Sequence, residues 1–397
     1  MSRDDRSSLS PFIPTLDVEA AVKQRYSSAS REVQPSLCCP VEYDSRLLEL
    51  LPREIIDRDY GCGDPSKYVN SGDDVLDLGS GGGKVCYIAS QVVGPTGSVT
   101  GVDMNDEMLS LAREHREEVG QRIGYHNVQF HKGRIQDLAL DLDQLEQYLA
   151  ENPATTANDW LRVQAHSQEM RQKSPMIPDD SIDVAVSNCA LNLVDPAARH
   201  QLFSELFRVL RRGGRAVVSD IVCDEPVPIS LQNDPQLWSG CIAGAFVERE
   251  LPQAFADAGF YGMQLLERNV EPWATVEGIE FRSVTVAAFK GKHGSCMDHH
   301  EAVIYQGPWK SVTDDDGHVL RRGEPMAVCR KTFEIYNRAP YASQIVPVPP
   351  RDEVSEARAT PFDCRRDITR TPRETKGDGF RETKLPDESC CGGGGCN

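Results

Sequence analysis

Residues 75–83 read VLDLGSGGG, an apolar run that leads directly into a glycine-rich loop. An apolar run of this length followed by glycines is typical of a buried strand that ends in a turn. Gly79, Gly81 and Gly83 carry no Cβ, so their backbone can adopt positive φ and approach a ligand closely. The run therefore predicts a strand, then a loop that binds a nucleoside-bearing cofactor, then a helix.

The same alternation of strands and helices continues beyond this loop. The apolar patterns predict helices at 84–93, 107–119 and 199–210 and strands at 98–102, 128–131, 182–187 and 215–220. Gly213 and Gly214 are expected to end the last of these helices. Such alternation predicts an α/β fold, a parallel sheet with helices on both faces. The segment 138–178 interrupts it with helical patterns, which predict a helical hairpin that is either a lid or a passive insertion.

Composition limits the class of protein and of partner. A net charge of −18 over 397 residues argues against nucleic acid, because that binding depends on Lys and Arg at phosphates. No apolar run approaches the roughly 20 residues that span a bilayer, and the N-terminus lacks an apolar signal region, so we expect a cytoplasmic protein with no membrane partner. Thirteen cysteines in such a chain favour thiol chemistry or metal binding over disulfide staples.

The glycine loop has a register of its own. A dinucleotide fingerprint counted from Gly79 would place its third glycine at position 84, where Lys84 stands. The pattern is D-x-G-x-G-x-G starting at Asp77, which resembles the signature of S-adenosylmethionine-dependent methyltransferases of the Rossmann-like class I. The Asp103 carboxylate, at the end of the next strand, can accept two hydrogen bonds from a ribose diol. The alternative is a similar fold with another nucleotide.

The resemblance implies S-adenosylmethionine as cofactor and a set of residues that contact it. These residues are Asp77, Gly79, Ser80, Gly81, Asp103, Met104, Ile135 and Asn188.

Three cysteines are candidates for the acceptor site. Cys189 follows the strand 182–187, where open α/β sheets bind ligands, Cys241 lies after the fifth strand, and Cys62 precedes the first strand. Three thiolates suit a soft trivalent centre, whereas zinc usually takes four ligands that are often in C-x-x-C pairs. Arsenic(III) bound by three sulfurs keeps a lone pair that can displace a methyl group from a sulfonium. Such a reaction needs positioning and desolvation more than a general base.

At this point the chain resembles the arsenite methyltransferases. The matching pieces are 60–63 (YGCG), 76–81, 101–104, 187–189 with 192–194, and 238–245. The resemblance implies that Cys62, Cys189 and Cys241 bind arsenic(III), and that an N-terminal relay thiol, Cys38 or Cys39, exchanges disulfides with them. Arsenite or its thiol conjugates would be the substrate, and thioredoxin or glutathione the reductant.

Two other functions fit the same residues. The acceptor could be a small organic molecule with the cysteines merely buried, or the chain could be a non-catalytic thiol protein that senses or sequesters metalloid. Among the remaining cysteines, Cys86 is expected to pack as a small hydrophobe and Cys296, although near His299 and His300, to lie in a solvated loop. Cys329 and Cys364 give no signal.

These patterns divide the chain into four parts. Residues 1–70 are expected to form an N-terminal cap segment, and 71–262 the methyltransferase domain with its insertion at 138–178. Residues 263–345 are expected to form a smaller C-terminal α+β domain. Residues 346–397, rich in Pro, Arg, Asp, Glu and Thr, are expected to be a disordered tail that ends in Cys390, Cys391 and Cys396.

Overall fold

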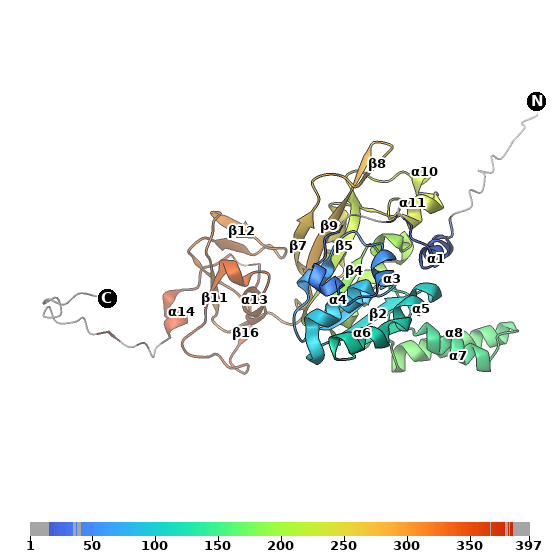
Figure 1. Ribbon diagram of the computed structural model, residues 1–397. Coiled ribbons are helices and arrows are strands. Elements are labelled where there is room, and N and C mark those ends of the chain that lie inside the picture. Colours follow the sequence, from blue (N-terminus) through green and yellow to red (C-terminus); the bar gives the residue numbers. More distant parts are fainter. Residues whose placement is uncertain are drawn as a thin grey trace, which may run out of the picture. The chain divides into compact units, whose positions relative to one another are not determined.

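A computed structural model describes residues 16–34, 37, 41–365, 367–377, 380, 382 and 383. It divides into two compact units, Met1–Gly291 (unit 1) and Lys292–Asn397 (unit 2) (Figure 1). Five cysteines lie outside the described residues: the predicted relay thiols Cys38 and Cys39, and Cys390, Cys391 and Cys396 at the end of the tail.

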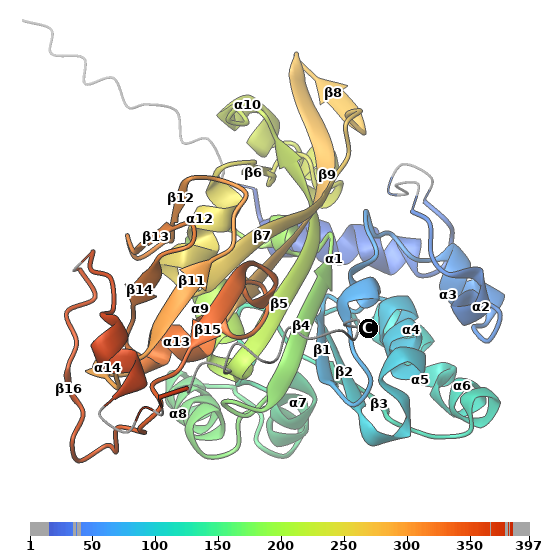
Figure 2. The ribbon, with the colours of Figure 1, turned by 90° about the vertical axis from the view of Figure 1, so that its left-hand side faces the viewer.

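Unit 1 is built on one large sheet with the strand order β3-β2-β1-β4-β5-β9-β7 (Figure 2). The first five strands in this order are parallel: β3 (Val128–Lys132), β2 (Ser98–Asp103), β1 (Asp74–Leu78), β4 (Ile182–Asn188) and β5 (Leu210–Cys223). Strand β9 (Ile279–Phe289) pairs antiparallel with β5 and with β7 (Tyr261–Arg268). Two short strands lie outside this order: β6 (Phe246–Val247) pairs with β5, and β8 (Ala274–Val276) pairs with β9. The predicted α/β fold with a parallel sheet is confirmed.

Helices cover both faces of this sheet (Figure 2). One face carries α4 (Lys84–Val93), α5 (Asp106–Glu114) and α6 (Arg116–Ile123), and the other carries α9 (Arg199–Val209) and α12 (Glu250–Asp257). The N-terminal segment adds α1 (Val18–Ala29), α2 (Ser45–Leu48) and α3 (Arg53–Asp57), and α10 (Ile229–Gln232) and α11 (Pro235–Ser239) follow β5. The strands are buried because apolar side chains face helices on both sides.

Two local predictions were wrong. The helix expected at 107–119 breaks at His115 into α5 and α6. Gly213 and Gly214 do not end a helix, because α9 already ends at Val209 and both glycines lie inside β5. Gly214 is needed there because an added Cβ would lie 2.9 Å from the carbonyl oxygen of Asp183.

The expected helical hairpin is present in the insertion. It consists of α7 (Leu142–Glu151) and α8 (Ala157–Lys173), joined by a turn in which Thr156 and Asp159 form a capping box. The rings of Tyr148 and His166 stack 3.8 Å apart between the two helices.

The boundary between the units differs from the one expected at 262 and 263. The run 283–289 is not part of an appendage, because β9 lies between β5 and β7 in the main sheet. This run is apolar because it is buried on both faces of the sheet. The main unit therefore extends to Gly291.

Unit 2 is also more ordered than expected. Strand β11 (Ala302–Tyr305) pairs with β14 (Pro325–Ala327) and with β15 (Ile345–Val348), while β12 (Ser311–Thr313) pairs with β13 (Val319–Arg321). Strand β10 (Met297–Asp298) pairs with β16 (Thr360–Pro361), and two helices, α13 (Arg330–Tyr336) and α14 (Pro372–Lys376), complete the unit. The segment 346–397 was predicted to be disordered, but its described part contains most of β15 and all of β16 and α14, and the two strands pair with β11 and β10. No helix among the described residues has the length and apolarity needed to cross a bilayer.

Candidate functional site

One pocket opens at the carboxyl ends of the parallel strands of unit 1. Its space, with the open mouth included, is about 1020 Å³, which is enough for a nucleoside-sized ligand. All eight residues predicted to contact the cofactor line it: Asp77, Gly79, Ser80, Gly81, Asp103, Met104, Ile135 and Asn188. Cys189 lines it as well. No residue of the inserted hairpin α7–α8 is among the described residues of its wall.

The glycine loop forms the floor of the pocket. Gly79 and Gly83 have φ values of +73° and +88°, a left-handed conformation that side chains rarely adopt. A Cβ on Gly79 would lie 2.5 Å from the Cβ of Ala190, and one on Gly83 would lie 2.8 Å from the ring of Phe130. The buried Ser80 Oγ has no hydrogen-bond partner among the described residues. An unpaired hydroxyl in the wall of a pocket fits a ligand that supplies the missing partner.

Two carboxylates stand beside this loop, the buried Asp77 and the half-buried Asp103. Asp103 accepts hydrogen bonds from the backbone N–H of Gly81 (2.9 Å) and of Asn105 (2.8 Å), and burial raises its pKa against these bonds. Burial raises the pKa of Asp77 to about 7, and the thiol of Cys86 donates to Asp77 Oδ2 at 3.1 Å. Cys86 is therefore buried as predicted, but it also serves as a hydrogen-bond donor.

Helix α1 closes one side of the pocket. Glu19, Lys23 and Tyr26 of this helix line the wall. Arg25 Nη1 donates to the carbonyl oxygen of Gln236 at 2.6 Å, which ties α1 to the helix that precedes Cys241. Burial, and after it the nearby Cys241, raise the pKa of Tyr26 well above its ordinary value. The cap segment predicted from the sequence thus contributes to both the pocket and the cysteine cluster.

The structure brings the three predicted cysteines together. Cys62 and Cys189 form a disulfide with a Cα–Cα distance of 6.0 Å, and the Cys241 thiol donates to the carbonyl oxygen of Cys189 at 3.3 Å. All three side chains are buried. The sequence predicted a disulfide among the site cysteines but not its partners, so the structure adds the pairing of Cys62 with Cys189 and a third sulfur close to it.

The backbone at this cluster is strained. Cys189 and Cys241 have φ values of +57° and +61°, a region that non-glycine residues seldom occupy. Hydrogen bonds hold both in place: the Cys189 N–H donates to Ser219 O at 2.8 Å and the Cys241 N–H to Trp238 O at 3.0 Å. Strained residues held in this way cluster at functional sites.

Asn188 connects the cysteine cluster to the pocket. Its Oδ1 accepts from the N–H groups of Cys62 (2.8 Å) and Gly63 (3.1 Å). Its Nδ2 donates to Gly63 O (2.8 Å) and to the Tyr43 hydroxyl (3.1 Å). The packing is so close that a Cβ on Gly61 would lie 2.0 Å from Nδ2. Asn188 was predicted to face the cofactor, and although it lines the pocket, its amide holds the loop that carries Cys62.

Sequence reasoning missed Asp220. One of its carboxylate oxygens lies within 4.8 Å of the sulfurs of Cys62 and Cys189. Burial raises its pKa to about 7, although the N–H groups of Ile221, Asn192 and Leu191 donate to the carboxylate. A signal was available, because Asp220 is the last residue of the strand expected at 215–220, at the same sheet edge as Cys189.

Apolar side chains surround the cysteines. The buried residues packed with them are Ile221, Cys223, Val227, Leu231, Ile242, Val247, Ile279 and Phe281. Such surroundings exclude water and strengthen electrostatic interactions inside. The arrangement therefore places sulfur ligands in a dry environment beside a nucleoside-sized pocket.

Known proteins resemble both units. A family model described as a methyltransferase domain matches residues 69–148 and 147–268, and one described as a domain of unknown function matches 292–380. An arsenite methyltransferase of Aquipseudomonas alcaligenes is 30% identical over 79% of this chain and 85% of its own. The human arsenite methyltransferase is 27% identical over 87% of this chain and 86% of its own. A crystal structure of an arsenic(III) S-adenosylmethionine methyltransferase from Chlamydomonas reinhardtii is 26% identical with a TM-score of 0.53, covering 83% of this chain and 99% of that one.

Proposed function

The chain belongs to the arsenite methyltransferase family, and on that premise we propose that Cys62, Cys189 and Cys241 bind arsenic(III) and present it to the methyl group of S-adenosylmethionine. The observation that carries the proposal is the position of Cys189. It lines the pocket formed by the glycine loop and Asp103, and it is bonded to Cys62 and in contact with Cys241.

The residues of the pocket fit the cofactor. The Asp103 carboxylate has the chemistry to accept hydrogen bonds from a ribose diol, and the unpaired Ser80 hydroxyl can bond a polar ligand. When bound, S-adenosylmethionine supplies a methyl carbon that its sulfonium makes electrophilic. The glycine loop allows close approach, and α1 shields one side from water.

Arsenous acid has three hydroxyl groups on arsenic, so three thiols can bind it fully. Each thiol replaces one hydroxide on arsenic, so three As–S bonds form and three water molecules leave, with no change of oxidation state. The lone pair that remains on arsenic would take the methyl group, the sulfonium–methyl bond of the donor would break to leave a neutral thioether, and arsenic would become formally pentavalent. The chain contributes position and desolvation to this step, through the apolar residues around the sulfurs.

Formation of a disulfide then supplies the two electrons that reduce the pentavalent arsenic. Cys62 and Cys189 give two electrons to arsenic, which returns to the trivalent state while the two sulfurs form a bond with each other. The Cys62–Cys189 disulfide of this structure is the product expected of that step. A thiol reductant such as thioredoxin or glutathione must supply two electrons and two protons to reopen it, and Cys38 or Cys39 would relay them.

Product speciation tests the proposal. Purified protein is incubated with arsenite, a thiol reductant and S-adenosylmethionine, and the arsenic species are separated. We expect methylated arsenic from the wild type and none from Cys189→Ser, which should still bind S-adenosylmethionine. Cys223→Ser is the matched control, because it removes a buried thiol of the same apolar cluster that has no proposed ligand role.

Two outcomes would contradict the proposal. Turnover by Cys189→Ser would remove Cys189 from the site. Failure of arsenite to block alkylation of Cys62, Cys189 and Cys241 in the reduced protein would favour the small organic acceptor instead. A protein that binds arsenite in this way but never methylates it would be a metalloid sensor or store.

A further inference from the structure

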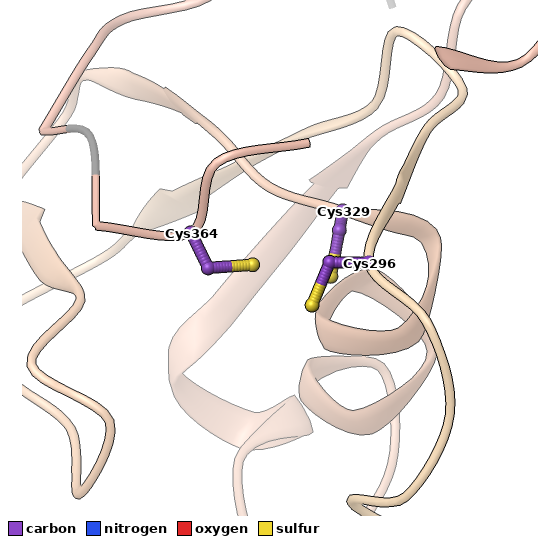
Figure 3. A group of neighbouring side chains, drawn as sticks. All are labelled: Cys296, Cys329 and Cys364. Carbon is purple, nitrogen blue, oxygen red and sulfur yellow. The ribbon is translucent and has the colours of Figure 1, made fainter. Parts of the chain in front are cut away.

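Unit 2 contains a second group of three cysteines, Cys296, Cys329 and Cys364 (Figure 3). Their sulfur atoms all lie within 4.8 Å of one another. Cys329 is fully buried, whereas Cys296 and Cys364 are partly exposed. In Figure 3 the Cys364 side chain points toward the other two. Sequence reasoning assigned Cys296 to a solvated loop and found no role for the others, so this convergence is new.

Pairing of short strands produces the convergence. Cys296 comes directly before β10 and Cys364 follows β16, its antiparallel partner. The N–H of Phe362 donates to Cys296 O at 2.8 Å, which extends this pairing toward Cys364. The backbone therefore fixes two of the three sulfurs on neighbouring segments.

The third sulfur comes from the start of helix α13. Cys329 follows β14, and the N–H of Val328 donates to Glu301 O at 3.3 Å, directly before β11. Cys329 is the N-cap of α13, where its sulfur accepts from the Thr332 N–H at 3.4 Å and contacts the Thr332 hydroxyl at 3.2 Å. This orients the thiol before any ion binds.

The surroundings act oppositely on two of the three thiols. Burial acts to raise the pKa of Cys296, but hydrogen bonds from Cys364 and Cys329 and the positive charge of Lys331 outweigh it and lower the pKa below the ordinary value. The Cys364 pKa moves the other way, first through burial and then through its hydrogen bond with Cys296.

The number and kind of ligands select the ion. Within the part of the chain that the structure describes, the group contains three cysteines and neither histidine nor carboxylate. Structural zinc takes four ligands. A trivalent metalloid needs only three sulfurs, and soft thiolates are the ligands it prefers.

We propose that Cys296, Cys329 and Cys364 form a second arsenic(III)-binding site, in unit 2. Three thiols and one arsenous acid give three As–S bonds and three water molecules, and no electrons are transferred. The choice of arsenic among trivalent metalloids rests on the function proposed for unit 1. The existence of a three-sulfur site rests only on the geometry of unit 2. Binding at this site needs no methyl donor, and none of its three cysteines is among the described residues that line the pocket of unit 1.

Binding stoichiometry tests this site in the full chain. Protein reduced with a phosphine is mixed with arsenite and desalted, and the arsenic that remains is measured by elemental mass spectrometry. The wild type should retain about two arsenic atoms per chain, and the variant with all three residues of unit 2 changed to serine about one. Serine is also a good N-cap, so Cys329→Ser keeps the start of α13. Thr332→Val is the matched control, since it removes a buried hydroxyl beside Cys329 but no ligand.

A parallel variant separates this proposal from the first. Serine at Cys62, Cys189 and Cys241 should remove the other arsenic atom and leave the one in unit 2. Equal retention by the wild type and the unit 2 variant would overturn the second site, whatever happens in unit 1. Zinc bound to the protein as purified, and lost only in the unit 2 variant, would overturn arsenic as its ligand.

A measurement on the wild type decides the matter if the triple variant does not fold. Bound arsenite should protect Cys296, Cys329 and Cys364 from N-ethylmaleimide, read by mass spectrometry of their peptides. Full alkylation of these three cysteines at saturating arsenite would refute the site.

Discussion

Replacing Asn188 by alanine should weaken arsenite binding far more than it weakens binding of S-adenosylmethionine. The side chain makes four hydrogen bonds of 2.8–3.1 Å, three of them to the backbone of Cys62 and Gly63 and one to Tyr43. Without them the loop that carries Cys62 loses its connection to the end of β4. The first sulfur is then no longer held next to Cys189.

The magnitude follows from the count of bonds. A hydrogen bond within a protein contributes about 0.5–1.5 kcal/mol net, so four contribute roughly 2–6 kcal/mol. We expect the free energy of arsenite binding to weaken by about 3 kcal/mol, because the freed backbone groups of Cys62 and Gly63 regain some hydrogen bonds to water. That loss corresponds to a roughly hundredfold higher dissociation constant for arsenite. Binding of S-adenosylmethionine should change by less than about tenfold, because Asn188 is one of many residues in that wall.

Calorimetric titration of the phosphine-reduced protein with arsenite, and separately with S-adenosylmethionine, measures both constants. Asn127→Ala is the control. The Asn127 side chain makes three hydrogen bonds, with Ser90, Gly94 and Gly97. It lies directly before β3, at the end of the sheet opposite to Asn188. It should lower thermal stability and leave arsenite affinity unchanged. Wild-type affinity in Asn188→Ala, or an equal loss in Asn127→Ala, would refute the reasoning.

Two further predictions concern the glycine loop and the strand before it. Gly83→Ala should lower the stability and the S-adenosylmethionine affinity well beyond the effect of Gly94→Ala, measured by thermal melting and titration. Both positions have positive φ, but only at Gly83 would the new Cβ collide with another residue, Phe130 at 2.8 Å. Equal losses of stability and affinity in the two variants would contradict this account. Asp77 has a pKa of about 7 in the folded protein against about 3.9 in an unfolded chain, so its ionisation destabilises the fold increasingly as the pH rises from about 4 to about 7. The unfolding free energy of Asp77→Asn should therefore rise relative to the wild type by up to about 4 kcal/mol between about pH 4 and about pH 8, and a constant difference in urea titrations would be evidence against a raised pKa.

The sequence was sufficient wherever a signal was local. The strand, the glycine loop and α4 follow each other without interruption, so their period and punctuation predicted them. Asp103 and Cys189 were predictable because the carboxyl ends of parallel strands meet at one sheet edge. The same rule covers Asp220, which was missed although it ends the strand expected at 215–220; its raised pKa depends on burial that only the fold supplies.

Signals that depend on distant pairing were not available. The strands β7 and β9 read as an appendage because nothing in their own residues says that β9 pairs antiparallel with β5, far back in the chain. The Cys62–Cys189 disulfide likewise depends on Asn188, whose amide holds the loop against β4.

The cysteines of unit 2 show the same limit most clearly. The segments that carry Cys296 and Cys364 meet through strands of two residues each, β10 and β16, which are too short to have a period. Unit 2 thus contains one group of three cysteines and unit 1 contains another. A count of cysteines therefore cannot separate ligands from inert thiols. The position of each cysteine separates them: Cys189 lies in the wall of a methyl-donor pocket, whereas Cys329 caps a helix and is not among the described residues of that wall. Arsenic held by unit 2 should therefore follow the concentration of arsenite and not the rate of methylation.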